Sequence, residues 1–253
     1  MSDDNKETTM QSDWEHLSPE VTPQNEAPVD EKYLKAFFGA ELGWDVKYHE
    51  DCNEAEVQEH LKETRTILKD DKYNNGSFKY YCLFVAVMSH GGEEYFLTKD
   101  EKEFKYADVF SEFTNGKIPE FAGRPKVFLM QSCKGKEVQN EILSDHVREQ
   151  CPILDDSDIL VIWATTPGCK AFGRSSDGSF LIEVTINHFQ QKFASDDVEC
   201  MLSDIRRTIA YGQKYRSTPG ANVPYRQMPC TWSTLTDKLY LIRYQCVLQK
   251  YPR

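Results

Sequence analysis

Apolar residues along this chain alternate between short unbroken runs and runs with a helical spacing. The unbroken runs, typical of strands that are buried on both faces, occupy residues 80–88, 125–130 and 159–164. The helical spacing predicts helices around them, at residues 30–42, 53–68, 104–113, 179–193 and 198–211. This alternation predicts an α/β fold, in which a mostly parallel sheet carries helices on both faces.

The flanking residues indicate where several elements begin and end. Asn53 and Glu56 match a capping box at a helix start, and Gly43 is a plausible helix C-cap. Segments 44–48 and 239–248 are predicted to be strands, the second of them terminal. Residues 1–29 carry seven acids, one lysine and three prolines. Such a composition buries too little apolar surface to fold, so we expect a disordered tail.

Composition excludes several classes of function. The net charge of −11 argues against nucleic-acid binding, which needs a basic surface. The longest apolar run, 82–88, is too short to span a bilayer, and the acidic N-terminus does not match a signal peptide. The eight cysteines form no Cys-x-x-Cys pair and no metal-type spacing with the six histidines. We therefore expect a cytoplasmic protein with free thiols, no metal or other cofactor, and no membrane or nucleic-acid partner.

A histidine and a cysteine follow two of the predicted strands, as Ser89-His90-Gly91 and Gln131-Ser132-Cys133. The carboxyl ends of adjacent parallel strands meet at one edge of a sheet. A thiol ionises too little at neutral pH to act alone, whereas a nearby imidazole accepts its proton and later protonates a leaving amine. The alternative is an inert core cysteine and a turn histidine. Their shared position at strand ends favours a nucleophile–base pair.

The segment from Gln131 to Gly135, with a histidine about forty residues earlier, resembles the active-site signature of the caspases, with Ser132 in place of alanine. Segments 158–168, 174–180 and 227–240 extend the resemblance over about residues 30–245. It implies a three-layer caspase fold and a Cys133–His90 dyad that cleaves protein substrates after aspartate. It also implies a dimer joined through the C-terminal strand.

Further roles come from the same resemblance. Caspases hold the substrate aspartate with a glutamine and two arginines, which implies Gln131 and Arg174 in this role. The amides of Gly91 and Cys133 correspond to the family's oxyanion donors. Two features depart from the family. The family's first strand and its Arg-x-Gly segment have no counterpart before Asp30, and Gly173 replaces a usual tryptophan in a shortened loop. We expect the first strand and one pocket arginine to be missing.

The acidic stretch after Cys133 has two interpretations. It is either a solvated loop or a processing linker, because Ile142-Leu-Ser-Asp145 has the character of a caspase cleavage site. A cut at Asp145 divides the chain into a large-subunit-like part, 30–145, and a small-subunit-like part, 146–253. Asp155 and Asp156 are competing sites.

The first predicted function is a caspase-like cysteine endopeptidase, of reduced activity because its pocket is incomplete. It would work in apoptosis or related proteolytic signalling, as a homodimer or as a heterodimer with another caspase. A second interpretation is a truncated, weakly active or inactive regulator that pairs with a full-length caspase. A third is a related peptidase that cuts after basic residues, against which Gln131 and Arg174 argue.

Overall fold

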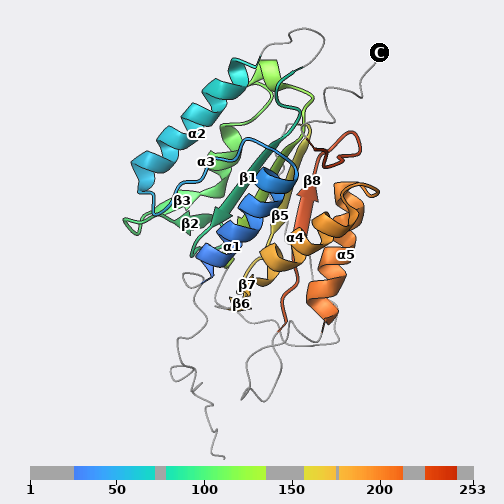
Figure 1. Cartoon of the computed structure of the whole chain (residues 1–253). Helices are drawn as coiled ribbons and strands as arrows, with labels where there is room; N and C mark the ends of the chain where they lie inside the picture. Colours follow the sequence, from blue (N-terminus) through green and yellow to red (C-terminus); the bar gives the residue numbers. More distant parts are fainter. Residues whose placement is uncertain (1–25, 72–77, 135–156, 175–176, 213–225, 244–253) are drawn as a thin grey trace, which may run out of the picture.

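A four-stranded sheet forms the centre of the molecule (Figure 1). The computed structural model describes residues 26–71, 78–134, 157–174, 177–212 and 226–243. The strands lie in the order β1 (Leu83–Met88), β4 (Lys126–Gln131), β5 (Ile159–Trp163) and β8 (Cys230–Ser233). The first three are parallel and β8 is antiparallel to β5.

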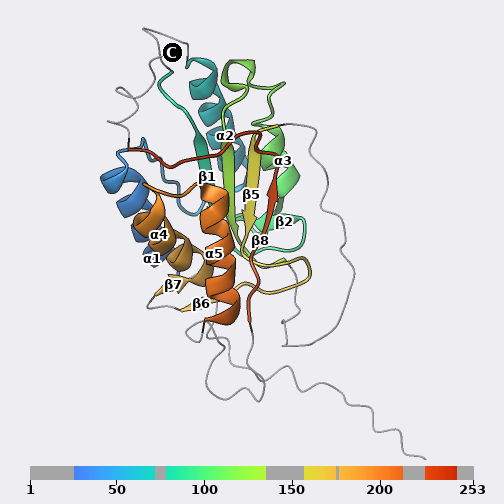
Figure 2. The same ribbon diagram turned by 90° about the vertical axis from the view of Figure 1, so that its right-hand side faces the viewer.

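Helices cover both faces of this sheet (Figures 1 and 2). One face packs against α2 (Glu54–Lys69) and α3 (Tyr106–Ser111). The other packs against α1 (Ala27–Leu34) with its π-helical continuation η3 (Lys35–Glu41), α4 (Phe180–Lys192) and α5 (Val198–Tyr211). Smaller elements are β2 (Tyr95–Leu97), β3 (Glu103–Lys105), η4 (Pro119–Phe121), β6 (Gly173–Arg174) and β7 (Gly178–Ser179). This arrangement confirms the predicted α/β class.

Strand β4 shows why an unbroken apolar run is needed. Val127 and Leu129 point into the core beneath η3, α4 and α5, whereas Phe128 and Met130 point into the core beneath α2 and α3. All four are 0% exposed. Successive side chains of a strand point to opposite faces, so a strand covered on both sides needs apolar residues at every position.

The local helix signals are also confirmed. The Asn53 side chain accepts a hydrogen bond from the Glu56 N–H at 3.1 Å, and the Glu56 carboxylate accepts one from the Asn53 N–H at 2.8 Å. Gly43 follows the end of η3 with a φ of +71°, a conformation that suits glycine. Helix α1 begins at Ala27, three residues before the expected start. Residues 1–25 of the predicted tail lie outside the described residues.

Three predicted elements differ from the structure. Residues 44–48 are not a strand, because none of the described strands pairs with them. In the predicted terminal strand, 239–243 is irregular and 244–248 lies outside the described residues; the last described strand is β8, earlier in the chain. The predicted helix at 104–113 begins with the short strand β3 and becomes helical only at Tyr106.

Strand β1 lies at the edge of the sheet. Among the described strands only β4 pairs with it, and all six of its residues are half-buried. No helix in the described parts of the chain is long and apolar enough to cross a membrane.

Candidate active site at the carboxyl edge of the sheet

Cys133 and His90 follow two neighbouring strands, and they stand at equivalent positions beyond the strand ends. In the parallel pair of β1 and β4, Met88 is the register partner of Gln131, and the Ser89 N–H donates to the Gln131 carbonyl at 3.2 Å. His90 stands two residues beyond Met88, and Cys133 two residues beyond Gln131. Both residues are half-buried. The fold therefore brings the predicted nucleophile and base to the same edge of the sheet.

The segment around Ala171 passes over the thiol. The Ala171 N–H donates to Cys133 Sγ at 3.5 Å, and Sγ lies 3.9 Å from the Ala171 carbonyl oxygen. The turn after β5 is fixed beside it, because the Lys134 N–H donates to the Cys169 carbonyl at 2.9 Å and the Gly168 N–H donates to the Lys134 carbonyl at 2.8 Å. The thiol thus lies between two backbone segments of defined position.

Gly91 occupies a position that admits no side chain. A Cβ there would lie 2.6 Å from the Tyr95 carbonyl oxygen and 2.8 Å from the Tyr106 hydroxyl. The Leu97 N–H donates to the His90 carbonyl at 2.8 Å, and the Gly92 N–H donates to the Tyr95 carbonyl at 2.9 Å. Because backbone groups alternate in direction along an extended chain, the Gly91 N–H points away from β2. The Gly91 N–H can therefore donate to a group on the side away from β2.

Tyr106 contacts the strand end that carries Cys133. Its hydroxyl lies 2.5 Å from the Ser132 hydroxyl, and burial raises the pKa of Tyr106 to about 12. The neutral phenol therefore persists across the physiological range and connects α3 to the residue before Cys133. Sequence reasoning missed Tyr106, although a tyrosine on the buried face of a short helix is a weak signal for such a hydrogen bond.

Gln131 and Arg174 lie on different sheets of the molecule. Gln131 ends β4 and is 2% exposed, and its Oε1 is buried without a hydrogen-bond partner among the described residues. Arg174 lies in β6, which follows the Ala171 segment and pairs with β7. Its guanidinium is 3.8 Å from the Asp177 carboxylate and 4.9 Å from the centre of the Phe180 ring.

Two buried acids at the start of α1 hold the β6–β7 hairpin. Ser179 donates its N–H to Asp30 at 2.8 Å and its hydroxyl to the same carboxylate, and Glu26 lies 3.4 Å from the Ser179 hydroxyl. Burial, together with the neighbouring acid, raises the pKa of Glu26 to about 7, and burial raises that of Asp30 to about 6. A Cβ on Gly173 would collide with the Glu26 carboxyl group. The glycine that replaces tryptophan thus makes room for a buried acid.

Gln227 fixes the same hairpin from the other side. It is 1% exposed, and its Oε1 accepts a hydrogen bond from the Phe172 N–H at 2.6 Å. Phe172 directly precedes β6, so Gln227 sets where the arginine strand begins. Sequence reasoning noted residues 227–229 only for their resemblance. The role of this side chain, like those of Glu26 and Asp30, depends on long-range contacts that no local pattern encodes.

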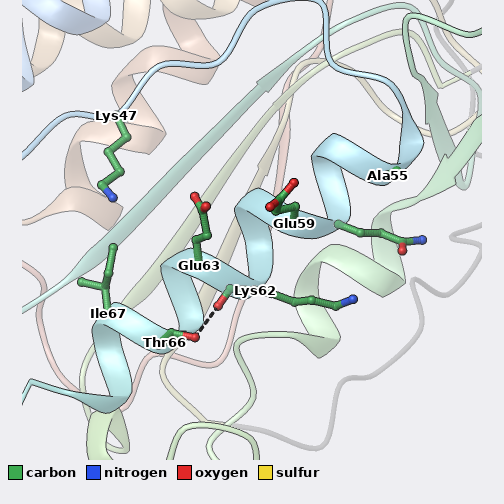
Figure 3. Close-up of a pocket in the computed structure, with 8 residues that line it drawn as sticks. Lys47, Ala55, Glu59, Lys62, Glu63, Thr66 and Ile67 are labelled. Atoms are coloured by element: carbon green, nitrogen blue, oxygen red, sulfur yellow. Dashed lines mark hydrogen bonds between the residues drawn. The ribbon is translucent and has the colours of Figure 1, made fainter.

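Other predicted features are not part of this edge. Asp145 lies outside the described residues. A hollow against α2, lined by residues such as Glu59, Lys62 and Glu63, contains none of the predicted site residues (Figure 3). Within the described residues, no cluster of His, Cys, Asp and Glu is suited to holding a metal ion.

Comparisons with known proteins identify the family. The caspase domain model matches residues 19–240. Caspase-1 of Drosophila melanogaster is 27% identical to this chain, and the match covers 86% of this chain and 67% of the relative. Caspase-8 of Mus musculus is 25% identical, and the match covers 79% of this chain and 42% of the relative. The chain thus spans about two thirds of the first and less than half of the second. The crystal structure of Caspase-1 from Spodoptera frugiperda superposes on this structure with a TM-score of 0.73 and a sequence identity of 23%. The match covers 87% of this chain and 84% of the other.

The chain therefore belongs to the caspase family, and its fold is that of a caspase domain. Membership of this family supports a caspase-like cysteine peptidase, a hydrolase that acts on protein substrates.

Proposed function

We propose that this protein is a cysteine endopeptidase that cleaves after aspartate by a Cys133–His90 dyad. The observation that carries the proposal is the in-register pair of strand ends that bring these two residues to one edge. A family member that had lost catalysis would be under no constraint to keep a thiol and an imidazole at matched positions.

The reaction follows from the chemistry of the two groups. His90 accepts the thiol proton, and the Cys133 thiolate attacks the carbonyl carbon before the leaving amine. The N–H groups of Gly91 and Cys133 stabilise the resulting oxyanion. His90 then protonates the amine as the carbon–nitrogen bond breaks, which leaves a thioester. Water, activated by His90, hydrolyses the thioester and restores the free thiol.

Recognition of the substrate aspartate is assigned to Gln131 and Arg174. The NH2 group of the buried Gln131 amide and the Arg174 guanidinium on the adjoining hairpin are donors suited to a carboxylate, which accepts several hydrogen bonds. The resemblance assigns no second arginine of this chain to the pocket, and a pocket without it would lose a charge-assisted contact of roughly 1.5–3 kcal/mol. Weaker binding of aspartate and a lowered kcat/KM are the expected consequences.

Purified full-length protein tests this proposal on peptides with aspartate or arginine before the scissile bond. The expected result is slow cleavage of the aspartate peptide that Cys133→Ala abolishes. Addition of a segment carrying a first strand and an Arg-x-Gly sequence should raise kcat/KM at least about tenfold, since about 1.4 kcal/mol of transition-state binding corresponds to that factor. Preferential cleavage of the arginine peptide would contradict the assignment.

The proposal includes processing and assembly. A cut after Asp145 would separate parts of 30–145 and 146–253, and the cytoplasmic setting, apoptotic role and dimer belong to the same proposal. Mass spectrometry of concentrated protein should find a fragment starting at His146, and Asp145→Ala should remove or relocate it. An uncut chain that still hydrolyses peptides would identify the stretch as an ordinary loop.

The outer edge of β1, with which no other described strand pairs, favours a second candidate, a regulator that pairs with a full-length caspase. This candidate predicts no cleavage by the isolated chain. It also predicts a dose-dependent change in a partner caspase's activity that Cys133→Ala leaves intact.

A further inference from the structure

The outer edge of β1 borders a groove of about 490 Å³. β1 forms one side of this groove, and residues 43–48 form the opposite side. Val46, in the second group, is 40% exposed despite being apolar. The groove thus separates β1 from the segment that was predicted, wrongly, to be a strand.

The backbone of β1 has hydrogen-bonding groups on this side that pair with none of the described residues. The Leu83 N–H donates to the Pro125 carbonyl at 2.9 Å and the Ser89 N–H to the Gln131 carbonyl at 3.2 Å, so the odd-numbered residues face β4. Backbone groups alternate along a strand, and the N–H and C=O groups of Phe84, Ala86 and Met88 therefore face the groove. Such an edge is a template for another strand.

The two walls of the groove are lined by different kinds of residues. On the α1 side, Leu34, Phe38 and Trp44 supply an apolar surface, and the charged Glu31 and Lys35 also line it. On the α2 side, Thr64 and Ile67 line the groove, and beyond them lies the charged surface of α2 seen in Figure 3. A strand that fits here needs apolar residues on one face and a mixture of polar and apolar residues on the other.

The C-terminal part of the chain arrives at the mouth of this groove. The Ile242 carbonyl accepts a hydrogen bond from Trp44 Nε1 at 3.0 Å, and the Ile242 N–H donates to the Tyr81 hydroxyl at 3.1 Å. Trp44 and Tyr81 both line the groove, and Tyr81 lies just before the amino end of β1. Figure 2 shows this red segment crossing from β8 toward the blue end of α1 and η3.

We propose that residues 244–249 dock in the groove as a fifth strand, parallel to β1. They follow Ile242 almost directly, and six residues of strand span about 20 Å, the length of the six-residue β1. Their sequence alternates as the walls require. In a strand docked with Tyr244 toward α1, Cys246 and Leu248 would share that face, and Gln245, Val247 and Gln249 would share the face toward α2.

Two other occupants fit less well. The β1 strand of a second copy is itself covered on its outer side by residues 43–48, which hinder edge-to-edge pairing. Residues 1–25 carry six acids and two prolines, and they join α1 at Glu26, beside the β6–β7 hairpin at the carboxyl edge. Of these three occupants, the C-terminal segment continues from Ile242, which is hydrogen-bonded beside the amino end of β1, and its sequence has a matching alternation.

Hydrogen exchange of the β1 amides tests the proposal. In the full-length protein the amides of Phe84, Ala86 and Met88 should exchange at least about tenfold more slowly than in Val247→Pro, because proline removes a donor and breaks strand pairing. The matched control is Tyr251→Pro, beyond the docked residues, which should leave the exchange unchanged. The amides of Val127 and Leu129 in β4 should not differ among the three proteins.

Three results would overturn the proposal. Equal, rapid exchange of the β1 amides in wild type and Val247→Pro would show that the edge is unpaired. Equal, slow exchange in both would show that a different segment or a second copy covers it. Protection that depends on Val247 but disappears on tenfold dilution would show that the strand comes from another molecule.

Discussion

Strands β1 and β4 are both largely apolar and pair along their whole length, but their environments differ. All six residues of β4 are buried, whereas all six of β1 are half-buried. The difference lies in the neighbours, because β4 has a strand on each side and β1 has one only among the described residues. An unbroken apolar run therefore indicates the burial that a strand requires. Strand β1 is less buried than its apolar sequence requires, which indicates that a further segment covers its outer edge.

His90 follows β1 and Cys133 follows β4, so each strand positions one residue of the proposed dyad. Substitution of these two residues gives the largest expected effect on activity. Cys133→Ala should abolish peptide hydrolysis, His90→Ala should lower kcat by several orders of magnitude, and the double variant should be no worse than Cys133→Ala. Members of one catalytic unit lose nearly the same activity singly and together. Steady-state kinetics checks this. Wild-type-like turnover by either single variant would break the link between the strands.

Truncation of one leucine in each strand compares their burial directly. Leu129→Ala in β4 should lower the free energy of unfolding by about 2–5 kcal/mol, because its side chain is 0% exposed. Leu83→Ala in β1 should cost about half as much if the edge is open. Urea denaturation measures both. Equal losses in the free energy of unfolding would show that β1 is covered in solution. In that case, Leu83→Ala should cost less in a Val247→Pro background than in the wild type.

How far the sequence predicted the fold depends on how local each signal is. The buried runs of β4 and β5, the capping box at Asn53 and the face of α5 all lie within one segment, and each was predicted correctly. Residues 44–48 have a strand-like pattern too. A strand nevertheless needs a hydrogen-bonded neighbour, and that depends on the rest of the chain.

The same distinction holds for the candidate site. Cys133 and His90 were found because each follows its own strand, and parallel strands share an edge. Glu26 and Asp30 were not found, because their partner Ser179 is about 150 residues away in the sequence. The change at Gly173 was noticed as the loss of an indole, but nothing local indicated which side chain takes the space.

Addition of a single methyl group at Gly173 tests that packing. Gly173→Ala should lower the free energy of unfolding by about 1–3 kcal/mol, because the new Cβ collides with the buried Glu26 carboxyl group. The cost should shrink in a Glu26→Ala background. Gly116→Ala is the matched control and should be nearly neutral, because a Cβ there meets nothing within 4 Å. Additive effects of Gly173→Ala and Glu26→Ala would argue against direct contact.

The smallest expected effect is a pH dependence that comes from the same acid. The pKa of Glu26 is raised from 4.5 to about 7, so between these values the folded protein holds a proton that the unfolded chain releases. Stability from this group is complete below about pH 4.5 and is lost as the pH rises through 7. Asp30, with a pKa raised to about 6, acts in the same direction.

Glu26→Gln should therefore flatten the fall in stability between pH 5 and pH 8, by an amount on the order of 1 kcal/mol. Urea denaturation at both pH values measures it, with Glu59→Gln on the exposed side of α2 as the control. Histidines such as His188, whose pKa is lowered by burial, change stability in the opposite direction over this range. They are common to both proteins, so the difference between wild type and Glu26→Gln isolates the carboxyl group. An unchanged slope would show that Glu26 is ionised in the folded protein, and a buried carboxylate beside Asp30 would then need a cationic partner.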